Sequence, residues 1–120
     1  FYGFDDALYA ACRLIEIVAA SGQPLSHQLA GLPRYINTPE IRVDWADETK
    51  FGVVERVKEH FRALYPVNDV DGVRVSFPNG WGLLRASNTQ PVLVMRFEAE
   101  NEEQLAEYSS IFESALAAHR

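Results

Sequence analysis

From residue 41 onward, apolar residues recur at two alternating spacings, and this pattern limits the fold more than any other feature of the sequence. A spacing of two is typical of half-buried strands, whereas a spacing of three and four is typical of amphipathic helices. The spacing of two occurs over residues 41–45, 73–77, 81–86 and 92–100, and the helical spacing over residues 47–64 and 101–116. The predicted order of elements is therefore β-α-β-β-β-α.

Local signals mark where these elements begin and end. Asp47 and Asn101 are suitable caps for the two helices, and Gln104 completes a capping box with Asn101. Pro66 follows the end of the first helix, and Pro78-Asn79-Gly80 is a turn between two strands. The apolar stripes expected to be buried are Phe51, Val54, Val57, Phe61 and Leu64 in the first helix, Leu105, Tyr108, Phe112 and Leu116 in the second, and Leu93, Met95, Phe97 and Ala99 in the last strand.

Two amphipathic helices need an apolar surface on which to bury their stripes. A four-stranded, mainly antiparallel sheet with both helices on one face provides that surface. We therefore predict an α+β fold for residues 41–120, and we find no internal repeat.

The first 40 residues do not follow this pattern. Residues 5–20 are expected to form a helix that Asp5 and Asp6 cap and Gly22 ends, but its apolar residues surround most of its circumference. Such a helix is typically buried between partners. We predict that residues 1–22 are the last helix of a preceding domain, that the proline-containing residues 23–40 are an interdomain linker, and that the chain is a fragment.

Charge and cysteine content exclude several classes of protein. The net charge is −6 and the chain has one cysteine, Cys12, so neither broad phosphate-backbone binding nor a disulfide framework is expected. No apolar run approaches the roughly 20 residues that span a bilayer. These features favour a cytoplasmic protein, expected to be monomeric, that binds neither nucleic acid nor membrane.

The segment most suited to chemistry follows the strand of residues 81–86. Arg85 offers a planar fork of donors, and Ser87, Asn88 and Thr89 offer side-chain and backbone donors in the next loop. Together they could cradle one phosphate group. The alternative is a polar turn whose hydroxyls bind their own backbone while Arg85 forms a surface ion pair.

The sequence of this segment also resembles that of a known family. Gly-Trp-Gly-Leu-Leu, then Arg85 to Pro91, then Val-Leu-Val-Met-Arg-Phe-Glu-Ala is similar to the C-terminal domain of bacterial α-D-phosphohexomutases, the phosphomannomutase/phosphoglucomutase enzymes. Thr38-Pro39-Glu40-Ile41 resembles the linker into their last domain. Phe1-Tyr2-Gly3-Phe4-Asp5-Asp6 resembles the end of their third domain.

The resemblance implies an isomerase that interconverts hexose 1-phosphate and 6-phosphate, of glucose or mannose, through a bisphosphorylated sugar. In that family the last of four domains holds the non-transferred phosphate, and residues matching Arg85, Ser87, Asn88, Thr89 and Arg96 would do so here. A structural ion pair with Glu98 is the alternative for Arg96. The phosphoserine, the sugar-selecting loop and the Mg²⁺ site belong to the other domains, its expected partners.

No catalytic residue and no metal ligand are therefore expected in this chain, which alone should be inactive. Asp69-Val70-Asp71-Gly72 is interpreted as a turn, and Cys12 as a small core residue. The histidines, which lack metal-ligand spacing and are expected in solvent, are His27, His60 and His119. The alternative function is a small α+β regulatory or protein-interaction module, which would not need the donors between Arg85 and Thr89.

Overall fold

A computed structural model of the chain describes Gly3 and residues 5–119. It divides the chain into two compact units, Phe1–Pro33 and Arg34–Arg120. The boundary lies inside residues 23–40, the segment predicted to be a linker. Of the residues at the start of the chain that contributed to the family resemblance, Phe1, Tyr2 and Phe4 lie outside the described residues.

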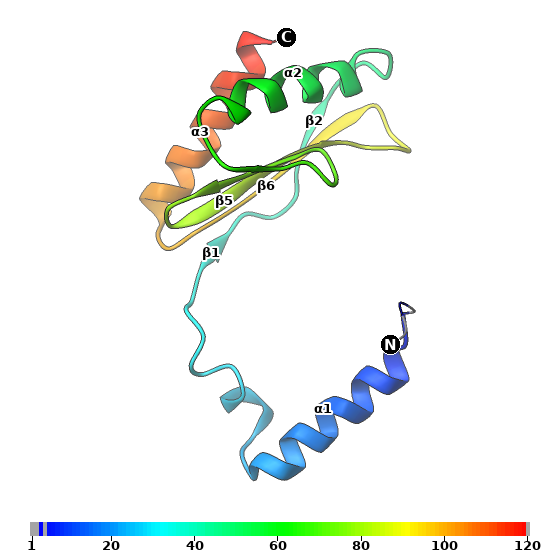
Figure 1. Ribbon diagram of the computed structural model, residues 1–120, viewed down its shortest axis with the longest axis vertical. Coiled ribbons are helices and arrows are strands. Elements are labelled where there is room, and N and C mark those ends of the chain that lie inside the picture. Colours follow the sequence, from blue (N-terminus) through cyan, green and yellow to red (C-terminus); the bar gives the residue numbers. More distant parts are fainter. Residues whose placement is uncertain (1–2, 4, 120) are drawn as a thin grey trace. The chain divides into compact units, whose positions relative to one another are not determined.

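The first unit contains one regular helix, α1 (Ala7–Ser21), followed by the short helix η1 (Leu25–His27) (Figure 1). The predicted caps form: the Asp6 carboxylate accepts a hydrogen bond from the Tyr9 N–H at 2.8 Å, and Gly22 ends the helix with φ of 62°. No residue of α1 is buried, and Leu8 is 82% exposed. Cys12 is also exposed, so its prediction as a core residue is wrong for this chain. The apolar surface that the sequence expected α1 to bury is therefore open to solvent.

The second unit is built on one antiparallel sheet. Within residues 34–119 its strands are β1 (Ile36–Asn37), β2 (Ile41–Asp44), β3 (Val67–Asn68), β4 (Val73–Phe77), β5 (Gly80–Ala86) and β6 (Val92–Ala99). The strand order is β1-β6-β5-β4-β3, and β2 also pairs with β6. The predicted strands are β2, β4, β5 and β6. The sequence analysis missed β1 and β3, because two-residue strands are too short to show a period.

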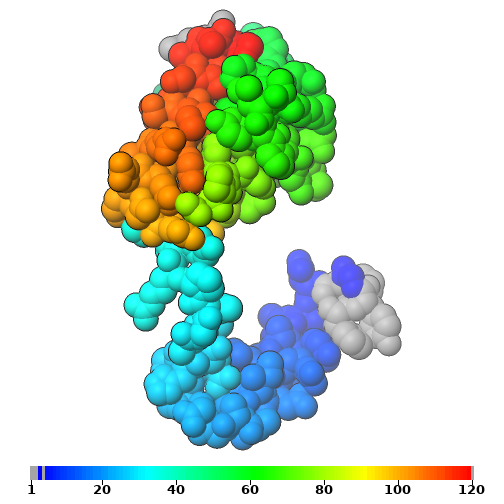
Figure 2. Space-filling view, turned by 60° about the vertical axis from the view of Figure 1, so that its left-hand side comes forward, coloured from blue at the N-terminus to red at the C-terminus, as the bar shows by residue number. Residues whose placement is uncertain are grey.

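The helices α2 (Lys50–Arg62) and α3 (Glu102–Ala118) pack on the same face of this sheet, as predicted (Figure 1). Aromatic rings join the elements: the Phe61 and Phe112 ring centroids of the two helices are 4.6 Å apart, and Phe77 of the sheet stacks on Tyr108 of α3 at 4.1 Å. The predicted stripes of α3 and β6 are all buried. Figure 2 shows α2 (green) and α3 (orange and red) side by side on the surface of the unit. The α+β fold is thus confirmed.

The start of α2 differs from the prediction. Thr49, and not Asp47, is the cap residue, and its side chain makes no capping hydrogen bond. The buried apolar residues of the helix are Val53, Val54, Val57 and Phe61. Phe51 is exposed, and Leu64 is exposed beyond the end of the helix. None of the helices that the structure describes has the length and apolar character needed to cross a bilayer.

Candidate anion-binding site

The candidate site lies where β5 ends and the loop 87–91 leads into β6. In the antiparallel register Arg85 lies opposite Val94, and Arg96 lies opposite Leu83. Strand residues alternate between faces, and Leu84 and Met95 are buried beneath the helices. Arg85 and Arg96 therefore project together from the face that the helices leave uncovered, as diagonal neighbours on adjacent strands.

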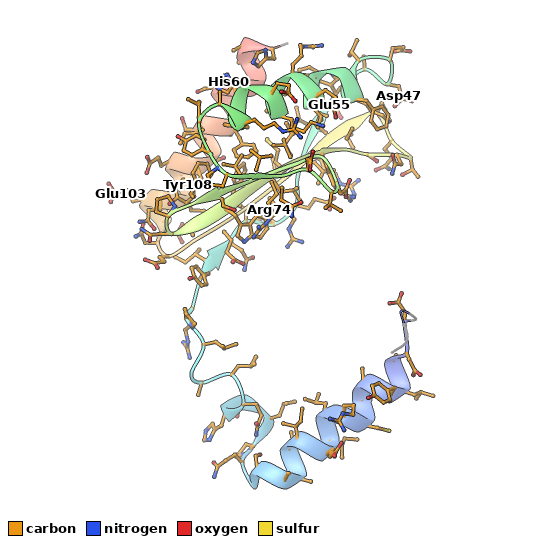
Figure 3. The ribbon with its side chains drawn as sticks, viewed as in Figure 1. Asp47, Glu55, His60, Arg74, Glu103 and Tyr108 are labelled. Atoms are coloured by element: carbon orange, nitrogen blue, oxygen red, sulfur yellow. The ribbon has the colours of Figure 1, made fainter. Side chains whose placement is uncertain are left out.

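Two further arginines share this face. The register places Arg42 of β2 opposite Val94, and Arg74 of β4 opposite Leu83. Figure 3 shows Arg74 on the side of the sheet away from the helices, and its guanidinium lies 4.7 Å from the Trp81 ring centroid. We call Arg42, Arg74, Arg85 and Arg96 the arginine face. The sequence analysis missed Arg42 and Arg74, although both alternate with core residues along their strands.

Arg85 and Arg96 differ in what they contact. The Arg85 guanidinium forms an ion pair with Asp71 at 3.0 Å, and its side chain is 40% exposed. Arg96 is exposed, and among the described residues no hydrogen bond or ion pair reaches it. The ion pair with Glu98 considered above is absent among the described residues, and Glu98 instead accepts a hydrogen bond from Trp81 Nε1 at 3.1 Å. Arg96 is therefore available to an anion from solution.

The loop itself is turned by the hydroxyl of Ser87. Ser87 Oγ accepts hydrogen bonds from the N–H groups of Thr89 at 3.3 Å and Gln90 at 3.2 Å. This is the local bonding that the turn interpretation expected of Ser87. The side chains of Asn88 and Thr89 are exposed at the tip. The loop thus combines a fixed backbone with two exposed polar side chains beside Arg85.

Three donors, from β2, from the residue that follows it and from the start of α2, hold the far end of the loop. The Trp45 N–H donates to the Pro91 carbonyl at 2.9 Å, and Lys50 Nζ donates to the Gln90 carbonyl at 2.9 Å. Arg42 donates to Gln90 Oε1 at 2.7 Å. These contacts join residues that are at least 40 positions apart in the sequence. The sequence analysis named neither Arg42 nor Lys50 because nothing local to either residue indicates the loop.

The other candidates have separate roles. Asp69 pairs with Arg62 and Asp71 with Arg85, in a turn where Gly72 has φ of 76°. Of the histidines, His27 and His60 are exposed, whereas His119 is half-buried with Nε2 shielded from solvent, so its prediction as a solvated residue is wrong. Among the described residues no group of three His, Cys, Asp or Glu side chains could hold a metal ion.

Comparison with known proteins identifies the family to which this fold belongs. The sequence profile described as "Phosphoglucomutase/phosphomannomutase, C-terminal domain" matches residues 40–114, which include all of the loop and the arginine face. The chain belongs to this family. Its membership confirms the resemblance on which the sequence analysis based its expectations.

Individual members of the phosphoglucomutase/phosphomannomutase family agree with this assignment. The chain is 41% identical over 119 residues to a phosphomannomutase/phosphoglucomutase of Pseudomonas aeruginosa, covering 98% of this chain and 26% of that protein. It is 43% identical over 117 residues to one of Pseudomonas putida, covering 97% and 25%. A solved phosphoglucomutase/phosphomannomutase family protein of Burkholderia thailandensis matches with a TM-score of 0.78 and 38% identity, over 99% of this chain and 25% of that one. The chain thus spans about a quarter of the length of these relatives.

Proposed function

We propose that this chain is the C-terminal part of a phosphohexomutase and that its arginine face and loop 87–91 hold the non-transferred phosphate of a hexose phosphate. The observation that carries the proposal is the placement of Arg85 and Arg96 on one open sheet face beside Asn88 and Thr89. Family membership and the names of the relatives support it. They do not favour the alternative of a regulatory or interaction module.

In the proposed chemistry this chain anchors one phosphate of the substrate, and groups outside the chain carry out the reaction. A guanidinium fork binds two phosphate oxygens at once, which fixes direction as well as position. Phosphoryl transfer depends on in-line geometry and on stabilising charge, so a distant anchor contributes by orienting the sugar. In our proposal the phosphoserine, the sugar-selecting loop and the Mg²⁺ site lie outside this chain. Because a bisphosphorylated sugar must present either end, an open site with few sugar contacts suits this role.

A titration of the chain with inorganic phosphate and with glucose 1-phosphate, followed by ¹H–¹⁵N NMR, tests the proposal. We expect saturable shifts confined to residues 85–89 and to Arg96, and we expect Arg85→Ala to abolish them. Arg56→Ala is the matched control, since Arg56 donates to the His119 carbonyl on the helical side of the unit. Shifts spread over the whole surface would instead indicate nonspecific binding and contradict the proposal.

If the titration shows no shifts, either the site forms only in the complete protein or the loop is an ordinary turn. A second experiment separates these two explanations. In the complete protein that carries this chain, Arg85→Ala should raise KM for the hexose phosphate and lower kcat/KM, because anchoring energy is lost in both the ground state and the transition state. If kcat/KM of the complete protein is unchanged by Arg85→Ala, the loop is an ordinary turn and the proposed function is wrong.

A further inference from the structure

Lys50 is the one charged residue that is buried in the described part of the chain, with a side chain 3% exposed. Removing an ammonium group from water is unfavourable unless hydrogen bonds and charges replace the lost hydration. Lys50 has two such partners. Its Nζ lies 2.5 Å from Asp47 Oδ1 and 2.9 Å from the Gln90 carbonyl oxygen. Figure 3 shows Asp47 at the end of the sheet where the β5–β6 loop lies.

The Gln90 carbonyl, which Lys50 binds, also belongs to the hydrogen bonds that shape the loop. The Gln90 carbonyl also accepts a hydrogen bond from the Val92 N–H at 2.8 Å, and the Gln90 N–H donates to Ser87 Oγ at 3.2 Å. The Gln90 peptide groups are therefore fixed on both sides. Asn88 lies within the turn that Ser87 and Gln90 close. A contact that fixes Gln90 therefore also restricts the positions that Asn88 and Thr89 can take at the tip of the loop.

We propose that Lys50 is a positioning residue for the anion site: it fixes the Gln90 carbonyl and thereby holds the loop in its anion-binding conformation. This inference rests on the proposed function of the loop. The Lys50 ammonium is buried beneath the loop and does not itself meet the anion. Its contribution is preorganisation, since a loop that is already ordered loses less conformational entropy when it binds.

The same helix provides a matched control. Lys58 is also largely buried, 12% exposed, and pairs with Glu55 at 2.5 Å, but no hydrogen bond or ion pair described for it reaches the loop. Lys58→Met removes a comparable ammonium group from α2 without touching Gln90. Lys50→Met removes the anchor while keeping most of the apolar volume. Lys50→Arg retains a donor for the Gln90 carbonyl and should restore much of the loss.

The test compares phosphate affinity, loop order and stability in these variants of the 120-residue chain. For Lys50→Met we expect phosphate to bind about tenfold more weakly, with faster amide exchange at Thr89 and Gln90 in a chain that remains folded. Lys58→Met should leave the phosphate affinity and the exchange unchanged. A purely structural role would lower the thermal midpoint of both variants without this selective loss. The proposal is wrong if Lys50→Met binds phosphate like the unaltered chain, or if Lys58→Met loses as much affinity.

Two complications have defined outcomes. If Lys50→Met does not fold, Lys50→Leu, which also lacks a donor, replaces it, and wild-type affinity in the leucine variant overturns the proposal. If the unaltered chain binds no phosphate, the variants are compared by KM in the complete protein. If Arg85→Ala leaves KM unchanged there, the proposed function is wrong. If Arg85→Ala raises KM but Lys50→Met does not, only this inference is wrong.

Discussion

Arg85 is paired with a carboxylate of its own chain. Asp71 lies 3.0 Å from its guanidinium, and both side chains are partly exposed. Exposed pairs of this kind contribute little to stability, so the pair is easily opened. A phosphate that reaches Arg85 must approach the Asp71 carboxylate, and two like charges several ångströms apart repel each other.

We therefore expect Asp71→Asn to tighten phosphate binding by about threefold to tenfold at low ionic strength, with the gain shrinking as salt is added. Titrations of phosphate at two salt concentrations would measure this. Asp69→Asn is the control, because Asp69 lies in the same turn but pairs with Arg62. Weaker phosphate binding by the Asp71→Asn chain would mean that Asp71 mainly orients Arg85.

Individual residues were predictable where the signal was local. The segment from Arg85 to Thr89 could be selected from the sequence because its donors are contiguous, and the caps Asp6 and Asn101 because they precede helical patterns. Lys50 could not be selected, since a lysine at the start of a helix normally lies in solvent. Its burial depends on a carbonyl 40 positions away.

At the scale of elements, two glycines should respond to alanine in opposite directions. A methyl group on Gly52 in α2 would meet only Arg56 Nη1 at 3.5 Å, so Gly52→Ala should stabilise the chain by about 0.5–1 kcal/mol through helix propensity. A methyl group on Gly82 in β5 would lie 2.5 Å from Phe112 Cε2, so Gly82→Ala should destabilise it by about 1–3 kcal/mol. Urea unfolding measures both free energies. Equal effects would contradict the packing described between β5 and α3.

Long helices and strands were predicted correctly, whereas the shortest strands were missed. The long strands β5 and β6 and the helix α3 have enough residues to show a period, whereas β1 and β3 do not. The start of α2 was misplaced because Asp47 has the chemistry of a cap but is used in an ion pair with Lys50.

At the scale of the whole molecule, the hydrophobic core belongs to one unit. The buried core cluster lies entirely within residues 53–116, and α1 contributes no buried residue. Deleting residues 1–33 should therefore leave the urea midpoint of the sheet unit unchanged. It should also reduce self-association of the chain, because exposed apolar surface such as Leu8 and Ile15 is removed. Equilibrium unfolding and sedimentation of both chains test this. A lower midpoint after deletion would show that α1 stabilises the sheet.

The pairing of β2 with β6 also has a consequence for the order of folding. Strands β4, β5 and β6 are neighbours in the sequence and can form by successive hairpins, whereas Ile41 meets Met95 only after a long stretch of chain has closed. The three donors that hold the loop come from the segment that arrives with β2. We therefore expect the tip of the β5–β6 hairpin to form early and to take its final shape late, so that the proposed anion site is completed after the sheet on which it rests.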